Sequence, residues 1–562
     1  MTLGTEILVI GGGATGLGVA YDAALRGFKV LLIEKGDLAN GTSGRYHGLL
    51  HSGGRYVISD PQSARDCAAE NAILRRILPE AIEDCGGWFV TTPADPEDYA
   101  GRWAAACREI GVPVEEYPIA AALKDEALLN PQTSHVFQVL DAGCDSFDLC
   151  HGLARAAREH GAQIWTRRRV VKLLIDGNRV RGVQVENSAT GEIETVLADL
   201  VLNCAGAWAG QMAALAGCDV WITPGKGIMI AMNSRLVNRA VNRLHPPNDG
   251  DILVPVGTVS IIGTTDTPIL DPDRYEIEPW EVDLLLEQGE ILIPRIREFR
   301  ALRAWAGVRP LFDPALQHSR LPADFKLQSG VSMPAESRTI TRAHAILDHS
   351  DRDGIDGLIS VVGGKLTTFR LMAQEALDLA CRKLNVERLC RTDREPISPP
   401  GRKFYHLGQR LESLKRQKGS EDSASSSFQP PPEYRATASE SIICECELVT
   451  RSQIEAALAE SGSLVLNDLR RDLRLGMGPC QGGFCIYRAA GILHQCREED
   501  QRITNSALVE YLQERWKGIR PLMWGHSLRQ LELDLRIYRE ILGADRLPLS
   551  RTPEVYPTER TA

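Results

Sequence analysis

The sequence predicts an α/β (α+β) protein with a dinucleotide-binding domain, an antiparallel-sheet domain and a small helical module. Three observations lead to this prediction. A glycine motif, Gly11-x-Gly13-x-x-Gly16, follows a short apolar run near the N-terminus. Residues 251–267 have the pattern of antiparallel strands, and four closely paired cysteines lie in a short helical segment near the C-terminus. The 562 residues are enough for two to four domains.

The predicted elements follow the chain in order. The apolar run 6–10, the segment 14–26 and the run 29–33 read as strand, helix and strand, which is one βαβ unit. Apolar residues at helical spacing predict helices over 60–82, 148–160 and 368–383, and strand patterns occupy 162–205 and 358–362.

Composition narrows the functional class. The chain is 43% hydrophobic and 25% charged, as is usual for globular proteins, and its net charge of −10 argues against a general nucleic-acid binder. No apolar run of about 18 residues is present, so we expect no transmembrane span and only peripheral attachment to a membrane. The ten cysteines outside the C-terminal quartet show no disulfide framework, which favours a reducing, cytoplasmic setting.

The glycine motif has the residues that a bound pyrophosphate needs. Gly11 permits the tight turn, Gly13 allows close backbone approach, and Gly16 allows the helix to pack on the strand. Glu34 ends the second strand and is placed to accept hydrogen bonds from a ribose. The alternative is a glycine-rich turn that binds nothing.

Later segments favour FAD over NAD. Asn203–Trp208 follows a strand and resembles the second glycine turn of flavoproteins. Gly363–Thr368 would bring a loop and a helix start near the flavin. No second complete dinucleotide motif is found, so we expect no separate NAD domain.

The C-terminal cysteines, Cys444-x-Cys446 and Cys480-x4-Cys485, predict a metal site. Four thiolates can hold one [2Fe–2S] cluster, and the spacing resembles the bacterioferritin-associated-ferredoxin (BFD) type of domain. Structural zinc is the main alternative, although zinc pairs usually have two to four residues between cysteines. An empty, vestigial site is the other alternative.

Several motifs occur in the order seen in FAD-dependent glycerol-3-phosphate dehydrogenases. They are Asn40–Ser43, His51–Tyr56, Gly263–Asp266, Ala306–Pro310, Ile340–Arg342 and Gly364–Arg370. The resemblance covers nearly the whole chain and implies a D-amino-acid-oxidase-like fold. With the cysteine module, the sequence resembles in particular the catalytic chains of the anaerobic, multi-subunit branch of that family.

The resemblance implies a set of site residues. Those that would bind FAD are Gly11, Gly13, Ala14, Thr15, Gly16, Glu34, Lys35, Thr42, Ser43, Ala205, Gly206, Gly364, Lys365, Leu366 and Thr367. Those that would bind the substrate are Arg55, Tyr56, Arg309 and Arg342. Arginine suits a phosphate ester because its planar fork binds two oxygens at once. The alternative for each single arginine is an ordinary ion pair.

With the resemblance, the predicted catalytic groups are Arg309, His51 and Lys365. Lys365 could stabilise developing negative charge, and Arg309 would lie near the reacting carbon. Many aerobic relatives have a histidine after a Lys-Gly pair, but here Lys226-Gly227 is followed by isoleucine. The base that removes the hydroxyl proton is therefore His51, Arg309 or a water molecule.

The function implied is oxidation of sn-glycerol 3-phosphate to dihydroxyacetone phosphate. Hydride would pass to flavin N5, and electrons would pass through the [2Fe–2S] cluster to partner subunits and quinone. This makes the chain part of a hetero-oligomer at the cytoplasmic face of the inner membrane. Two alternatives remain: a dehydrogenase of another anionic hydroxy acid, such as L-2-hydroxyglutarate, and a non-catalytic electron carrier.

We predict four regions. They are an FAD-dependent oxidoreductase over 1–395, a linker over 397–440, a [2Fe–2S] domain over 441–500 and a helical tail over 501–562. The tail carries Trp516, Trp524 and several leucines, and it could pack on the main body or dock onto a partner protein.

Overall fold

The predicted strand–helix–strand unit is the first feature of the computed structural model. It consists of β1 (Thr2–Ile10), α1 (Ala14–Leu25) and β2 (Val30–Ile33). The structure describes residues 2–188, 190–314, 340–397, 441–461, 465–497 and 501–549. The predicted linker beyond residue 397 and the end of the tail lie outside these residues, and the predicted domain boundaries stay predictions.

A parallel sheet forms the centre of the N-terminal half. Its strands run in the order β20 (Leu358–Gly363), β12 (Ile193–Asn203), β1, β2 and β9 (Gln163–Trp165). Ile10 pairs with both Ile33 and Asn203, and Asn203 pairs with Ser360. The strands therefore end at one edge of the sheet, which brings their following loops together.

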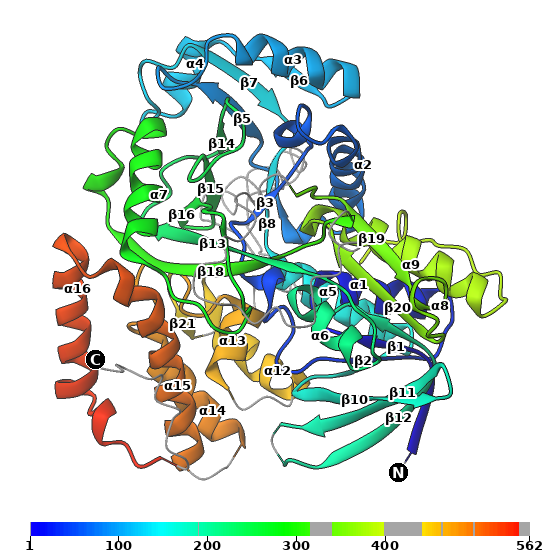
Figure 1. Ribbon diagram of the computed structural model, residues 1–562. Coiled ribbons are helices and arrows are strands. Elements are labelled where there is room, and N and C mark those ends of the chain that lie inside the picture. The colour runs from blue at the N-terminus through cyan, green and yellow to red at the C-terminus, as the bar shows by residue number, and fades with distance from the viewer. Residues whose placement is uncertain are drawn as a thin grey trace, which may run out of the picture.

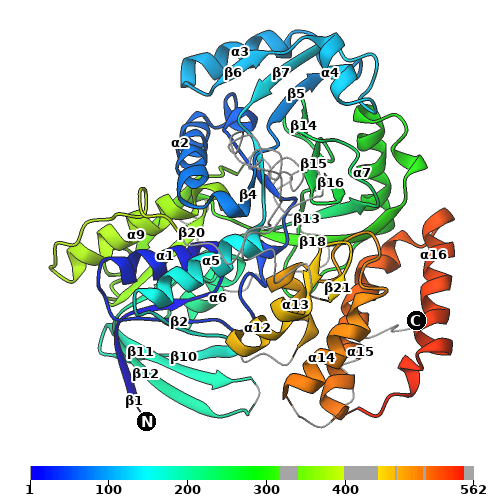
Figure 2. The same cartoon turned by 180° about the vertical axis from the view of Figure 1, so that it is seen from behind.

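Antiparallel strands extend this sheet, and helices cover it. The added strands are β10 (Arg168–Asp176), β11 (Arg179–Asn187) and β19 (His344–Asp348). Helix α1 packs between α5 (Ser146–Glu159) and α9 (Phe369–Lys383) in one apolar core (Figures 1 and 2). A Cβ on Gly18 of α1 would lie 2.8 Å from the Phe369 ring, so glycine allows this close helix contact.

The second sheet confirms the antiparallel pattern predicted over 251–267, where Leu253 pairs with Ile262. Its long strands are β13 (Thr223–Met232) and β18 (Ala301–Leu311), and α7 (Pro279–Leu292) packs against it. The remaining strands are β5 (Gly87–Thr91), β6 (Val114–Glu116), β7 (His135–Val139), β14 (Ala240–Arg243), β15 (Ile252–Val256), β16 (Val259–Gly263) and β17 (Thr267–Pro268).

Smaller elements join the two sheets. A short sheet contains β3 (Leu49–Leu50), β4 (Ile82–Glu83) and β8 (Ala142–Cys144). The other α-helices described in this half are α2 (Pro61–Ile77), α3 (Tyr99–Ile110), α4 (Ile119–Asp125), α6 (Ala209–Ala214) and α8 (His349–Asp353). No helix in the described ranges is both long enough and apolar enough to cross a bilayer.

The C-terminal part is helical. It comprises β21 (Ile442–Cys444), β22 (Val449–Thr450), α12 (Arg451–Ser461), α13 (Leu466–Leu473), α14 (Cys485–Arg497), α15 (Gln501–Ile519) and α16 (Gly525–Arg536). Leu508 and Tyr511 of α15 share an apolar core with α12, α13 and α14. Helix α15 also packs against β18, whereas α16 leaves Leu528, Leu533 and Leu535 about half exposed.

A buried ion pair joins α2 to α9. Arg370 donates to Glu70 from both Nε and a terminal nitrogen, and the two side chains are only 6% and 3% exposed. Removing one partner of such a pair leaves an uncompensated charge.

We expect Glu70→Gln to lower the free energy of unfolding by about 3–5 kcal/mol, because Arg370 loses its countercharge in a buried site. Thermal unfolding measures the change. The matched control is Glu298→Gln, which removes the exposed partner of Arg295 and should not change the transition. Equal stability of the two variants would contradict a structural role for the buried pair.

Candidate active site and cluster site

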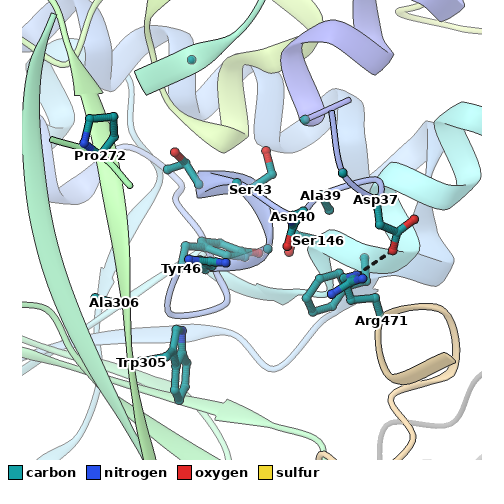
Figure 3. Close-up of a pocket in the computed structure, with 18 of the residues that line it drawn as sticks. Asp37, Ala39, Asn40, Ser43, Tyr46, Ser146, Pro272, Trp305, Ala306 and Arg471 are labelled. Atoms are coloured by element: carbon teal, nitrogen blue, oxygen red, sulfur yellow. Dashed lines mark hydrogen bonds and ion pairs between the residues drawn. The ribbon is translucent and has the colours of Figure 1, made fainter. Parts of the chain in front are cut away.

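A cavity of about 2340 Å³ is lined by residues of both sheets and of the C-terminal helices. Its wall includes the loop after β1, the segment 39–48 and residues of α13 and α15. Figure 3 shows Ser43, Tyr46 and Trp305 on its wall, with Arg471 of α13 bound to Asp37. The two halves of the chain therefore share one cavity.

The glycine loop brings the helix α1 close to β1. Gly11 has a φ of +111°, which favours glycine, and a Cβ on Gly16 would lie 1.9 Å from the Gly11 carbonyl oxygen. Gly13 precedes the first turn of α1, and its neighbour Ala14 donates its N–H to Ser43 Oγ at 2.9 Å. The positive end of the helix faces the cavity, as a bound pyrophosphate requires.

Glu34 lies at the end of β2 on the cavity wall. Its two carboxylate oxygens accept the backbone N–H groups of Gly12 at 2.6 Å and Gly36 at 2.7 Å. Burial raises the pKa of this carboxyl. The two backbone bonds hold the carboxylate in place, and each oxygen keeps a second lone pair that can accept a ribose hydroxyl.

The other residues predicted to bind FAD surround the same space. Those on the cavity wall are Gly11, Gly13, Ala14, Thr15, Glu34, Lys35, Thr42, Ser43, Ala205, Gly206, Gly364, Lys365, Leu366 and Thr367. Gly16 is set behind the loop, where it contacts Gly11. The loop and the helix start would hold the pyrophosphate of FAD, and Glu34 would hold its ribose.

Cationic side chains gather at the end of the cavity next to the second sheet. Arg309 of β18 donates to Thr264 Oγ1, to the Thr265 carbonyl at 3.0 Å and to Asp266 at 3.1 Å. A Cβ on Gly227 would lie 2.6 Å from the Arg309 guanidinium, so the glycine makes room for it. Arg309 is therefore held rigidly against the cavity.

Arg342 and Lys365 complete the cationic wall. Arg342 reaches the other oxygen of Asp266 at 3.3 Å, and its second terminal nitrogen is buried without a hydrogen-bond partner among the described residues. Lys365 Nζ donates to Ser63 Oγ and to the Arg342 carbonyl, each at 2.9 Å, and burial lowers its pKa. Two arginines thus share the carboxylate of Asp266, and Lys365 adds a third cation beside them, which favours an anionic ligand.

Arg55 and Tyr56 differ in position. Tyr56 lines the cavity, 5.2 Å from Lys365 Nζ to the ring centre. Arg55 is not part of the cavity wall in the described structure; it lies behind and binds Asp251 at 2.9 Å. The Arg55 guanidinium therefore already has a buried carboxylate as partner.

Two histidines lie beside these cations. Burial, His47 and Arg55 lower the pKa of His51 well below its usual value, and burial with Arg55 and Arg309 lowers the pKa of His47 to about 3. Leu49 donates its N–H to His47 Nδ1 at 3.1 Å, so the neutral ring carries its proton on Nε2. Both imidazoles are neutral at physiological pH.

The four cysteines meet in the C-terminal part. The thiols of Cys444 and Cys485, of Cys446 and Cys480, and of Cys480 and Cys485 lie within hydrogen-bonding reach. The hydrogen bond from Cys485, supported by the N–H groups of Gly476 and Glu447, lowers the pKa of Cys444 to about 7. Converging sulfurs with backbone N–H donors fit an iron–sulfur cluster.

Glycines shape the loop that carries two of these ligands. A Cβ on Gly478 would lie 2.3 Å from the Cys446 Cβ, and a Cβ on Gly476 would lie 1.9 Å from the Tyr511 hydroxyl. The loop therefore follows the cluster site closely and packs on α15. Cys444 and Cys485 are buried, whereas Cys446 and Cys480 are half-buried.

Comparison with known proteins shows which family has this combination of domains. The family model "FAD dependent oxidoreductase" matches residues 6–334, and the model "BFD-like [2Fe-2S] binding domain" matches residues 442–495. The A1 chain of the anaerobic glycerol-3-phosphate dehydrogenase of Haloferax volcanii is 40% identical over 98% of this chain and 92% of its own. This protein belongs to the family of anaerobic glycerol-3-phosphate dehydrogenase A chains.

Another member of the anaerobic glycerol-3-phosphate dehydrogenase family, the A chain from Escherichia coli K12, is 38% identical over 96% of this chain and 97% of its own. Glycerol-3-phosphate dehydrogenase from Bacillus halodurans, solved with FAD, aligns with a TM-score of 0.66 at 20% identity, over 93% of this chain and 96% of its own. The predicted fold class is confirmed, and the family models confirm FAD and a [2Fe–2S] cluster as the cofactors.

The sequence reasoning missed two side chains of this family member's site. His47 lies between the motifs Asn40–Ser43 and His51–Tyr56, and its spacing of four residues from His51 was a usable signal. Asp266 lies inside the motif Gly263–Asp266, where the sequence suggests no role for it, and the structure makes it the shared partner of Arg309 and Arg342. The surroundings of both side chains come from contacts between segments that are far apart in the sequence.

We expect Gly16→Ala to reduce the FAD content of the purified protein at least about tenfold, because the added methyl group collides with the Gly11 carbonyl and displaces the loop. The FAD content is measured by the flavin absorbance after heat releases the cofactor from the protein. The control is Gly101→Ala in α3, where a Cβ meets nothing within 4 Å. Normal FAD content in Gly16→Ala would show that this loop does not bind FAD.

The buried His47 should make stability depend on pH. Its folded pKa of about 3 lies below the unfolded value, so the unfolded chain binds more protons below about pH 6.5 and stability falls as the pH falls. Between about pH 6 and 4 we expect wild type to lose about 1.4 kcal/mol per pH unit more than His47→Gln. Urea unfolding at several pH values tests this, with the exposed His494→Gln as control. The same dependence of the unfolding free energy on pH in wild type and in His47→Gln would contradict this prediction.

Proposed function

We propose that this chain oxidises sn-glycerol 3-phosphate to dihydroxyacetone phosphate as the catalytic chain of a multi-subunit enzyme. The unpartnered nitrogen of Arg342, beside the fixed Arg309 and Lys365, carries this proposal. A phosphate dianion would satisfy that nitrogen and neutralise the surplus positive charge. Relatives that are 36–40% identical to this chain and are named anaerobic glycerol-3-phosphate dehydrogenases support the same substrate.

We assign different tasks to the cations. Arg342 and Lys365 would hold the phosphate, and Arg309, kept rigid by Asp266 and two threonines, would orient the carbon that is oxidised. Arg55 would act from behind, because it holds Asp251 and raises the positive potential at the histidines. Orientation by rigid groups of this kind accounts for much of an enzyme's rate.

We assign proton transfer to the neutral histidines. FAD, when bound, supplies the hydride acceptor for the substrate carbon. His51 lines the cavity and stays unprotonated, so a ring nitrogen can accept a hydrogen bond from the substrate hydroxyl; because its lowered pKa makes it a weak base, it would take the proton only as the hydride leaves. His47 has its proton on Nε2, because Nδ1 accepts the N–H of Leu49, and so would act as a hydrogen-bond donor.

We propose that electrons leave this chain for membrane-bound partner subunits and quinone. The [2Fe–2S] cluster supplies one-electron transfer between the flavin domain and a partner. Two of its ligands, the half-buried Cys446 and Cys480, line a second cavity of about 440 Å³, next to Phe484, which is 67% exposed. That second cavity would give a partner access to the cluster, and peripheral attachment to the inner membrane would follow from such a partner.

The decisive experiment adds sn-glycerol 3-phosphate to the anaerobic holoenzyme and records the visible spectrum. We expect the flavin band to bleach. In Arg342→Met, we expect kcat/KM to fall by at least about 100-fold, since a buried charge partner of the phosphate is lost. The exposed Arg295→Met should match wild type.

The substrate panel also includes L-2-hydroxyglutarate. Bleaching by this acid and not by sn-glycerol 3-phosphate would move the assignment to a carboxylate substrate. A flavin that no small substrate reduces would instead favour a non-catalytic electron carrier. Wild-type activity in Arg342→Met would contradict the phosphate site.

A further inference from the structure

The C-terminal part is attached to the flavin half through buried arginines on and after α13. Arg471 Nε donates to Asp37 at 2.6 Å, and Arg471 also binds Asp468 of its own helix. Asp468 in turn accepts a hydrogen bond from Arg167, which precedes β10. In both views α13 lies beside α5 (Figures 1 and 2).

Arg474 joins three parts of the molecule. It caps α13 at its C-terminal end with a φ of +58°, and its side chain is 11% exposed. One terminal nitrogen donates to Asp145 at 3.0 Å, and Nε donates to Glu447 at 3.0 Å. Because one rigid guanidinium makes both bonds, it sets the separation between Asp145 and Glu447.

Each of the two carboxylates that Arg474 binds lies next to one of the cofactor sites. Asp145 is the N-cap of α5 and accepts the N–H groups of Phe147 and Asp148, and its neighbour Ser146 lines the flavin cavity. Glu447 directly follows the cluster ligand Cys446. Arg474 therefore connects the wall of the flavin cavity to the cluster site.

The cavity itself extends to the cluster loop. Arg474, Met477 and Gln481 line it together with Tyr46, and Gln481 follows the ligand Cys480. The loop that carries this ligand is thus part of the wall of the flavin cavity. Electron transfer falls steeply with distance, so its rate depends on how firmly this loop is held.

We propose that Arg474 is a positioning residue that keeps the cluster loop against the flavin cavity, and that the cluster domain stays docked during turnover. The proposal deepens the proposed function, on which it rests for the source of electrons. The substrate supplies two electrons, and in the single-turnover test, which contains no added oxidant, one of them passes to the cluster and the other stays on the flavin.

The test follows the two redox sites separately. Anaerobic stopped-flow mixing with sn-glycerol 3-phosphate records bleaching of the flavin band and then loss of cluster absorbance, and freeze-quenched EPR counts reduced clusters. In Arg474→Gln we expect the first phase within about twofold of wild type and the second at least about tenfold slower. Arg474→Lys should give an intermediate rate, because it keeps the charge but cannot bridge both carboxylates.

Two further variants keep the test decisive. Arg451→Gln breaks the exposed pair with Glu455 on the same domain, away from the four ligands, and should leave both phases unchanged. Should Arg474→Gln lose its cluster, Asp145→Asn replaces it, since asparagine still caps α5 but removes the charge facing Arg474. An unchanged second phase in a variant with full cluster content would overturn the proposal.

Hydrogen–deuterium exchange of α13 and of the segment around Asp37 tests docking without any substrate. Faster exchange of both segments in Arg474→Gln than in Arg451→Gln supports the proposal, and equal exchange overturns it. If sn-glycerol 3-phosphate does not bleach wild-type flavin, the proposed function fails, and this exchange result still decides on docking.

Discussion

The architecture depends on one close contact, that between Gly16 of α1 and the carbonyl of Gly11. Any side chain at residue 16 would collide with that carbonyl, so the contact exists only because this residue is glycine. It sets the angle at which α1 leaves β1 and turns the positive end of the helix toward the cavity. The loops that end the neighbouring strands then meet at the same edge of the sheet.

The strand β18 contacts both the substrate side of the flavin cavity and the C-terminal part that holds the cluster site. Near one end it carries Arg309 at the substrate side of the cavity. Near the other, the Ala304 carbonyl lies against Gly518 of α15, where an added Cβ would be 3.0 Å away. Because a strand held in a sheet by hydrogen bonds is rigid, the two sites keep a constant relation. The buried charges around Asp266 and Arg474 are tolerated because each has a fixed partner.

Sequence reasoning was most successful where short segments carry the information. The glycine loop, the βαβ unit and the cysteine quartet each depend on short stretches of chain, and the structure shows the first two as expected and brings the four sulfurs together. It was weaker for side chains whose role depends on a distant partner. Arg55 is predicted at the substrate, and only the structure shows that Asp251, far along the chain, binds its guanidinium.

The sequence by itself determined the family, the two cofactors and the glycine loop and cysteine ligands that would hold them, because backbone turns and ligand spacings are local properties. Only the tertiary structure decided that Asp266 is shared by two arginines, that His47 and His51 are neutral, and that Arg474 bridges Asp145 and Glu447. These properties arise from burial and from charges brought together from distant parts of the chain. No local pattern encodes them, since desolvation and Coulomb interactions depend on position in space.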